Sequence, residues 1–349
     1  MFSSYRAEDV TILLKDITGC IDPLPTAERE RLIQSGHHYS EMLPLEYEPT
    51  EKYLEAYADA LARYAGITAQ ATARLAEQIY AEKGSDAALV SLARAGTPIG
   101  ILLKHYIRQR FGADVAHYTI SIIRGRGIDA NAMDYILARH APAAVQFVDG
   151  WTGKGAIQCT LAEAAAPYAG LSAGLAVLSD PAYVAEKCGT HDDFLIASSC
   201  LNATVSGLLS RTVLRADLIG PADFHGAAFY EALRGKDLTY DFIDSVERLF
   251  PPAASPIEEA AAHTSGLAEV ERIAADFGIA DINLVKPGIG EATRVLLRRL
   301  PWKLLVHSTA DEERLGHLYQ LAEEKGVEVA AYPLRNYLAC GLIRTLADN

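Results

Sequence analysis

The stretch Val145-Gln-Phe-Val-Asp-Gly-Trp-Thr-Gly-Lys-Gly155 decides the fold, because a short apolar run ends there in an acidic residue and a glycine-rich turn. The run has the length of a buried strand, and residues 154–168 have helical spacing. Ligands of an open parallel sheet bind beyond the carboxyl ends of its strands, where such turns meet helix N-termini. Glycines let a ligand approach the backbone, and the helix dipole favours an anion. We therefore predict an anion-binding loop that includes Asp149, Thr152, Gly153, Lys154 and Gly155.

On both sides of this loop, short apolar runs alternate with helical stretches. The sequence predicts strands over 87–93, 116–123, 144–148 and 173–178. It predicts helices over 98–110, 130–140 and 154–168, preceded by two helices over 49–64 and 68–83. This alternation is typical of an α/β domain whose parallel sheet is covered by helices on both faces.

A second alternation of predicted strands and helices follows residues 250–256, which are rich in proline and alanine. The predicted elements are a helix over 293–299, a strand over 303–307, a helix over 311–325, a strand over 328–332 and a helix over 334–346. We therefore divide the chain into an N-terminal helical segment, a first α/β domain, a linker with an acidic helix, and a smaller α/β domain. Their ranges are 1–85, 86–245, 246–280 and 281–349.

Composition excludes several classes of protein. The 349 residues include 45 acidic and 32 basic side chains, a net charge of −13 that argues against non-specific coating of nucleic acid. Five cysteines without a CxxC pair argue against a zinc ribbon and a disulfide-built secreted domain. The sequence shows no export signal and no uninterrupted apolar run of about 20 residues, so we expect a cytoplasmic protein without a membrane segment.

The charge is unevenly distributed along the chain. Residues 281–349 hold nine basic and nine acidic side chains, so the negative balance belongs to the preceding residues. A basic cluster stands in this neutral part: Lys286, Arg294, Arg298, Arg299 and Lys303. It is typical either of a solvated helix face or of a surface for a polyanion.

Two other predicted strand ends carry arginine and glycine. Arg94-Ala-Gly96-Thr97 follows the strand over 87–93, and Arg124-Gly-Arg126 follows the strand over 116–123. A guanidinium group offers a planar fork for phosphate oxygens. Three such ends on one sheet favour a phosphate-rich ligand.

This order of turns resembles the type I phosphoribosyltransferases. The resemblance implies that phosphoribosyl pyrophosphate (PRPP) binds with Mg²⁺, which the substrate brings and Asp149 helps to hold. Arg94 and the loop with Arg124 and Arg126 would meet the pyrophosphate, and Asp149 would orient the ribose. Two features depart from the pattern: Gly150 stands where a second acidic residue is usual, and the loop is about two residues shorter.

Three segments resemble a more specific bacterial family, linked to tellurium-resistance and stress-response (Ter) operons. They are residues 147–155, residues 38–44 and residues 200–208. Some members of this family carry the label cysteine protease StiP, while the same region is also described as a phosphoribosyltransferase. The resemblance also implies that the N-terminal segment forms a hood over the acceptor, and we keep a homodimer as an open prediction.

The C-terminal residues resemble the Pelota and kink-turn class of RNA-binding domains. The resemblance rests on Gly288-Ile-Gly-Glu-Ala-Thr293, the strand at 304–307 and the segment 333–343. It implies that structured RNA contacts Lys286, Glu291, Thr293, Arg294 and Arg298.

Two alternatives to a PRPP-dependent transferase stay open. A cysteine protease would use Cys200 or Cys188 with a base such as His191, because a thiol nucleophile needs a neighbouring histidine. Cys200 would open a helix over 200–208, whose dipole lowers thiol pKa values. The second alternative is a non-catalytic module that senses a nucleotide and binds RNA. We expect no dedicated transition-metal site, since the histidines lack the spacing of metal ligands.

Overall fold

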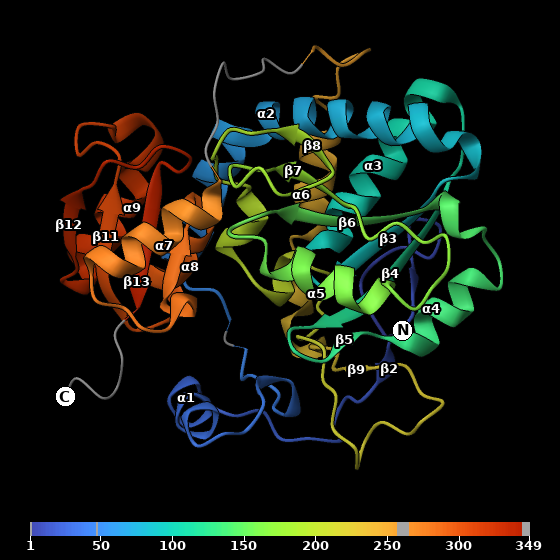
Figure 1. The fold of residues 1–349 in the computed structure, drawn as a ribbon, viewed down its shortest axis with the longest axis horizontal. Helices are drawn as coiled ribbons and strands as arrows, with labels where there is room; N and C mark the ends of the chain where they lie inside the picture. The colour runs from blue at the N-terminus through green and yellow to red at the C-terminus, as the bar shows by residue number, and fades with distance from the viewer. Residues whose placement is uncertain (1, 47, 257–264, 344–349) are drawn as a thin grey trace.

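The structure is a computed structural model, and it describes residues 2–46, 48–256 and 265–343. Its centre is a parallel sheet with the strand order β1-β4-β3-β6-β7-β8, and β5 pairs antiparallel with β4 (Figure 1). The strands are β1 (Thr11–Ile12), β3 (Ala88–Ala93), β4 (Ala116–Ile123), β5 (Gly127–Ile128), β6 (Val145–Trp151), β7 (Leu175–Ser179) and β8 (Lys187–Thr190).

Helices cover both faces of this sheet. One face packs against α2 (Glu51–Lys83), α3 (Gly96–Phe111) and α6 (Thr239–Glu247). The other face packs against α4 (Ala130–Leu137) and α5 (Ala156–Ala165) (Figure 1). The α/β class and the parallel sheet are confirmed, whereas the finer likeness to type I phosphoribosyltransferases stays a prediction.

Two features of the large domain differ from the sequence-based expectation. The two helices expected over 49–64 and 68–83 form the single helix α2. Gly66 inside a helix costs about 1 kcal/mol, which the burial of the neighbouring alanines offsets. Strand β8 was not predicted, because Lys187-Cys-Gly-Thr190 has no apolar alternation. Position 189 accommodates only glycine, because the Cβ of any other residue would lie 2.4 Å from the Ala71 carbonyl oxygen of α2, too close for two unbonded atoms.

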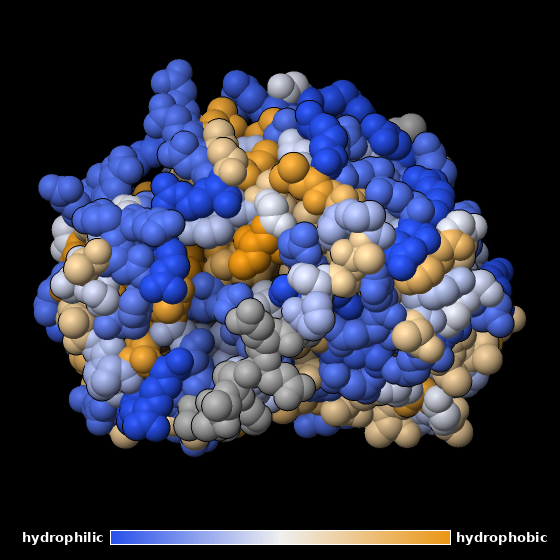
Figure 2. Space-filling model, turned by 90° about the horizontal axis from the view of Figure 1, so that it is seen from above, coloured by the Kyte–Doolittle hydropathy of each residue, from blue (hydrophilic) through white to orange (hydrophobic). Residues whose placement is uncertain are grey.

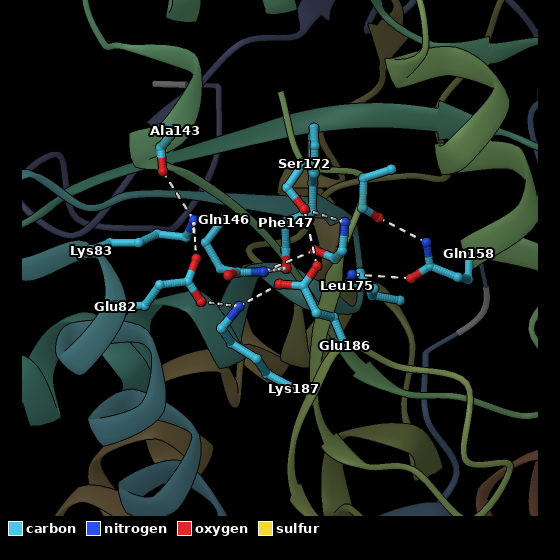
Figure 3. A network of polar contacts seen from close by, with 12 residues as sticks. Glu82, Lys83, Ala143, Gln146, Phe147, Gln158, Ser172, Leu175, Glu186 and Lys187 are labelled. Atoms are coloured by element: carbon cyan, nitrogen blue, oxygen red, sulfur yellow. Dashed lines mark hydrogen bonds and ion pairs between the residues drawn. The ribbon is translucent and has the colours of Figure 1, made fainter. Parts of the chain in front are cut away.

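A polar network ties the helices to the amino-terminal ends of the strands (Figure 3). The buried ammonium group of Lys187 pairs with Glu82 of α2 at 2.7 Å and with the neighbouring Glu186. On the next strands, the Gln146 amide donates to the Gly174 carbonyl at 2.9 Å, and Gln158 of α5 accepts from Leu175 N at 3.0 Å. This edge is therefore closed by structural contacts, which leaves the carboxyl ends of the strands for a site.

The N-terminal segment lies against the β4–β5 turn. It contains β2 (Lys15–Asp16), which pairs with β9 (Gly226–Ala227), and α1 (Thr26–Gln34). His38 Nε2 lies 3.1 Å from the Arg124 carbonyl oxygen, and the Tyr39 hydroxyl accepts from Arg124 N at 2.8 Å. Short 3-10 turns complete the chain: η1 (Tyr39–Glu41), η2 (Gly84–Asp86), η3 (Pro142–Ala144), η4 (Ala197–Cys200), η5 (Ala203–Val205), η6 (Glu231–Lys236) and η7 (Ile282–Leu284).

The smaller C-terminal α/β domain has a sheet with the order β10-β13-β11-β12. Its elements are α7 (Gly266–Asp276), β10 (Val285–Pro287), α8 (Ile289–Arg298), β11 (Pro301–Val306), α9 (Glu312–Lys325), β12 (Glu328–Ala331) and β13 (Ala339–Ile343). The helix expected over 334–346 is wrong within the described residues, because 339–343 form a strand between β10 and β11. A short apolar run buried on both sides does not distinguish a strand from a helix. Residues 344–346 and the linker residues 257–264 lie outside the described part.

The two domains share a continuous apolar core with α2 between them. Two tyrosines of α2 also reach carbonyl groups of the C-terminal domain: Tyr53 donates to Leu297 at 3.1 Å and Tyr64 to Arg314 at 3.2 Å. The face seen in Figure 2 is mostly hydrophilic, with apolar residues gathered near its middle. No helix in the described part of the chain has the length and apolar character needed to span a membrane.

Candidate functional site

The β6–α5 loop lies at the carboxyl end of the sheet, where the sequence predicts an anion site. Asp149 stands near the end of β6, and its Oδ1 accepts from Gly150 N at 2.8 Å. Burial raises the pKa of the Asp149 carboxyl to about 6; the nearby Glu291 raises it further, while Arg294 opposes the shift. Both neighbours belong to α8, so the C-terminal domain covers this loop.

The other loop residues are engaged in contacts within the chain. The Thr152 hydroxyl donates to the Asp180 carboxylate. Lys154 Nζ donates to the Ile282 carbonyl and, at 3.2 Å, to the Val285 carbonyl. Burial lowers the pKa of Lys154 to about 8, and the charges of Lys286 and Arg124 add to this shift. The loop therefore holds the two domains together.

The β3–α3 turn is likewise built into the surrounding structure. Arg94 donates to the Leu209 carbonyl at 2.8 Å, to Asn202 at 2.9 Å and to Glu46 at 2.8 Å. Gly96 allows α3 to approach β6, because a Cβ would lie 2.5 Å from the Val148 carbonyl oxygen. Thr97 is fully buried and accepts from the Thr119 hydroxyl at 3.0 Å.

The β4–β5 turn carries the remaining predicted arginines. Arg124 lies 5.6 Å from the Tyr39 ring and 3.5 Å from Asn283 Oδ1. Arg126 pairs with Glu41 and donates to the Leu214 carbonyl at 3.0 Å. These residues thus bind the N-terminal segment at the same edge of the sheet.

A thiol and an imidazole meet at the carboxyl end of β8. Cys188 Sγ lies 3.5 Å from His191 Nε2. On its other side, His191 Nδ1 lies 2.8 Å from the Asp180 carbonyl oxygen. Because a carbonyl oxygen can only accept, Nδ1 carries the proton and Nε2 is the unprotonated nitrogen. Cys188 Sγ lies 3.9 Å from Nδ1 as well, so the thiol lies over the imidazole ring, nearer to Nε2. The three residues have the arrangement of a nucleophile, a base and an orienting group.

The surroundings of this pair fix the imidazole ring. Tyr183 stacks on His191 with ring centroids 3.9 Å apart. The Asp180 carboxylate is buried and accepts from Thr152, from Val184 N at 3.2 Å and from Ala185 N at 3.0 Å. The loop that supplies the orienting carbonyl is therefore itself held by hydrogen bonds.

The thiol is protonated in this arrangement. The Cys188 residue is 7% exposed. Burial, with a contribution from the Asp180 charge, raises the pKa of the thiol to about 12. A buried thiol of this kind reacts through a neighbouring base, since its thiolate is scarce at neutral pH.

The second cysteine of the protease hypothesis lies in a different environment. Cys200 is fully buried, and its Sγ lies 3.9 Å from the Ala56 carbonyl oxygen. The expectation of a helix that begins at Cys200 is wrong: Cys200 ends the turn η4, and the short turn η5 follows at Ala203–Val205. Cys200 therefore does not lie at the N-terminus of a helix.

The comparisons with known proteins bear on this site. Residues 3–247 match the family model described as Tellurite-like stress resistance cysteine protease StiP, which covers well over half of the chain. This chain belongs to the StiP family. A curated protein of Acinetobacter baylyi named Cysteine protease StiP is 38% identical to this StiP-family chain, over 98% of the chain and 94% of the relative. Residues 264–345 match the model described as PELOTA RNA binding domain. The resemblances to the StiP family and to the Pelota class are thus confirmed, whereas the resemblance to type I phosphoribosyltransferases is not shown.

The main functional interpretation of the sequence is wrong. The family model and the relative both name a cysteine protease, in place of a PRPP-dependent phosphoribosyltransferase. The residues that suggested a phosphate site have structural contacts instead: Arg94, Thr152 and Lys154 all bond to other parts of the StiP-family chain. Mg²⁺ with PRPP and the homodimer stay untested predictions. Among the described residues, no group of three or more His, Cys, Asp or Glu side chains could hold a metal ion.

The predicted RNA-contacting residues lie in β10 and along α8, which Arg298 ends. Glu291 and Arg294 face the β6–α5 loop, and Arg294 lies 4.5 Å from the Trp151 ring centroid. Thr293 is fully buried and donates to the Ile289 carbonyl at 2.8 Å. Burial lowers the pKa of Lys286. The Arg298 side chain lies outside the described part.

Asp180 and Tyr183 were missed by reasoning from the sequence. Ser179-Asp180-Pro181 ends β7 in the same way that Asp149 ends β6. An acidic residue at the carboxyl end of a parallel strand was therefore the available signal. Tyr183 has no such signal, since its stacking depends on the path of the β7–β8 loop.

Proposed function

We propose that this StiP-family chain is a cysteine peptidase with Cys188 as its nucleophile and His191 as its general base. One observation carries the proposal: Cys188 Sγ lies 3.5 Å from His191 Nε2, while His191 Nδ1 is held at 2.8 Å by the Asp180 carbonyl oxygen. Family membership supports the same chemistry.

The proposed reaction transfers the thiol proton as the new bond forms. His191 Nε2 takes the proton from Cys188 while Sγ attacks the carbonyl carbon of a peptide bond. The resulting imidazolium gives this proton to the leaving amine, and the C–N bond breaks to leave a thioester. Water, deprotonated by His191, then hydrolyses the thioester and restores the thiol. Asp180 is a positioning residue, because it acts through the imidazole.

The loop over 181–184 controls access to the thiol. A side chain this buried meets a peptide carbonyl only after local movement, and Tyr183 is the neighbour stacked on the base. Tyr183 has a φ of 55°, which a residue with a side chain adopts at an energetic cost. Movement of this loop therefore belongs to the proposed catalytic cycle.

The experiment compares two buried cysteines. Cys188→Ala and Cys200→Ala are assayed for hydrolysis of fluorescently quenched casein, with circular dichroism as the check on folding. We expect Cys188→Ala to abolish hydrolysis and Cys200→Ala to retain it. Hydrolysis that survives in folded Cys188→Ala, or that is lost only in Cys200→Ala, contradicts the assignment.

RNA binding by the C-terminal domain is a second candidate function. The match to the RNA-binding domain model supports it, as does the grouping of Lys286 and Arg294 next to the glycine turn at 288–290. Because phosphates are bound by clustered cations, Lys286→Glu with Arg294→Glu should weaken binding of a fluorescein-labelled RNA hairpin. Lys325→Glu, an exposed charge reversal at the end of α9, is the control and should leave binding unchanged. Equal binding by both variants contradicts this function.

A further inference from the structure

The cationic face of the C-terminal domain, formed by β10 and the first turns of α8, lies against the large domain. Figure 1 shows α8 on the side of the small domain that faces the sheet. The Arg294 guanidinium lies 4.5 Å from the Trp151 ring centroid. A Cβ added at Gly153 would lie 3.8 Å from the Pro287 carbonyl oxygen and 4.0 Å from Glu291 Cγ. The glycine loop therefore lies next to the start of α8, with room for little more than a methyl group between Gly153 and Pro287.

Polar groups lock this face in place. The Asp193 carboxylate, from the large domain, accepts from Ile289 N at 2.9 Å and from Leu338 N at 2.8 Å. It thereby caps the first turn of α8. In the other direction, Lys154 donates to carbonyl groups of η7 and β10. The first backbone donor of α8, Ile289 N, is thus used by the large domain.

Two other basic side chains of the C-terminal domain have acidic partners of their own. Lys303 pairs with Glu328 at 2.8 Å, and Arg314 pairs with Asp311 at 2.5 Å. Phosphate groups are attracted to clustered cations that local carboxylates leave uncompensated. Lys286 of β10 and Arg294 of α8 share a single neighbouring carboxylate, because Arg294 pairs with Glu291 at 3.3 Å and the same Glu291 charge acts on Lys286. One carboxylate does not compensate two positive charges. An RNA ligand would therefore need the face that the large domain covers.

We propose that RNA and the large domain compete for this face, so that the chain binds RNA there only when the two domains separate. This inference rests on the proposed RNA binding of the C-terminal domain. The apparent RNA affinity then equals the affinity of the open state multiplied by the fraction of molecules that are open. The Asp193 carboxylate is the latch, because it joins the large domain to two backbone donors of the small one.

Separation would also change the surroundings of the proposed dyad. Ala182 is fully buried in the core of the C-terminal domain. Its carbonyl accepts from Gly266 N at 3.1 Å, and the Pro181 carbonyl accepts from Asn336 at 2.9 Å. Docking therefore holds the loop that carries Tyr183, and RNA would release it.

The experiment shifts the balance between docked and open states in both directions. Asp193→Ala removes the latch, and Asp192→Ala, an exposed neighbour, is its control. Ser199→Cys with Gly290→Cys forms a staple, because a Cβ at Gly290 would lie 3.7 Å from Ser199 Oγ. Binding of the fluorescein-labelled RNA hairpin is measured by polarisation on the full chain, before and after reduction of the staple.

We expect Asp193→Ala to bind the hairpin about tenfold more tightly than the unmodified chain and Asp192→Ala. The oxidised staple should lose binding and recover it on reduction. Equal binding by the stapled and latch variants overturns the competition while leaving RNA binding intact. If no form binds the hairpin, both the competition and the proposed RNA binding of the C-terminal domain are overturned.

Discussion

Replacing His191 by alanine removes the base of the proposed dyad with little damage to the fold. The substitution deletes one hydrogen bond to the Asp180 carbonyl and one stacking contact with Tyr183. These contribute about 1 kcal/mol and about 0.5–1.5 kcal/mol to stability, against the about 5–15 kcal/mol typical of a folded domain. Loss of a general base lowers a rate by about 10²–10⁴-fold. Catalysis should therefore fall far more than stability.

The assay follows hydrolysis of quenched casein and the midpoint of urea unfolding in parallel. His307→Ala is a matched control, because the His307 side chain is 25% exposed against 29% for His191. Each ring also has a nitrogen near a carboxylate: His307 Nε2 lies 2.7 Å from Asp311, and His191 Nδ1 lies 4.0 Å from Asp180. The control should keep its activity and lose similar stability. Activity of His191→Ala within about twofold of His307→Ala would refute the role of His191 as the base, because removal of a general base predicts a far larger loss.

Three further outcomes follow from burial. Iodoacetamide should modify the exposed Cys159 before the buried Cys188 in the folded chain. The pKa of Cys188 is raised from 9.0 to about 12, which lowers its thiolate population about a thousandfold near neutral pH. Equal rates of modification, measured by peptide mass spectrometry, would contradict this prediction. The folded-state pKa of Asp149 lies above its unfolded value of 3.8, at about 6, so its neutral form favours folding. The contribution of Asp149 to the free energy of unfolding should therefore rise by about 2 kcal/mol as the pH falls from about 6 to about 4. Urea titrations should show this rise as the difference in pH dependence between the unmodified chain and Asp149→Asn. Gly96→Ala places a Cβ 2.5 Å from the Val148 carbonyl oxygen and should cost about 1–3 kcal/mol, whereas Gly235→Ala, with open space around it, should leave the thermal midpoint unchanged.

The large domain was predictable where strands and helices follow simple periodicity. The strand at 116–123 agrees with β4 residue for residue, and the run from 145 leads into α5 as expected. The failures come from packing between distant segments. Residues 339–343 form a strand because β10 and β11 lie on either side, and β8 exists because Gly189 admits α2. Periodicity within one segment holds no information about such neighbours.

The candidate site was only partly predictable for a related reason. Cys188 and His191 were identified as members of a protease hypothesis, but nothing in their spacing distinguished them from Cys200. The two cysteines are distinguished by the β7–β8 loop, which places the Asp180 carbonyl within hydrogen-bond distance of the His191 ring. The glycine loop after Asp149 was found, yet its partner is the C-terminal domain, whose docking no local pattern encodes.

Covalent trapping tests the central claim most directly. A peptidyl fluoromethyl ketone alkylates the thiol that a neighbouring base activates, and peptide mapping by mass spectrometry identifies the modified cysteine. We predict a single adduct on Cys188 that disappears in His191→Ala and persists in His307→Ala. An adduct on Cys200, or labelling of Cys188 that does not depend on His191, would contradict the account.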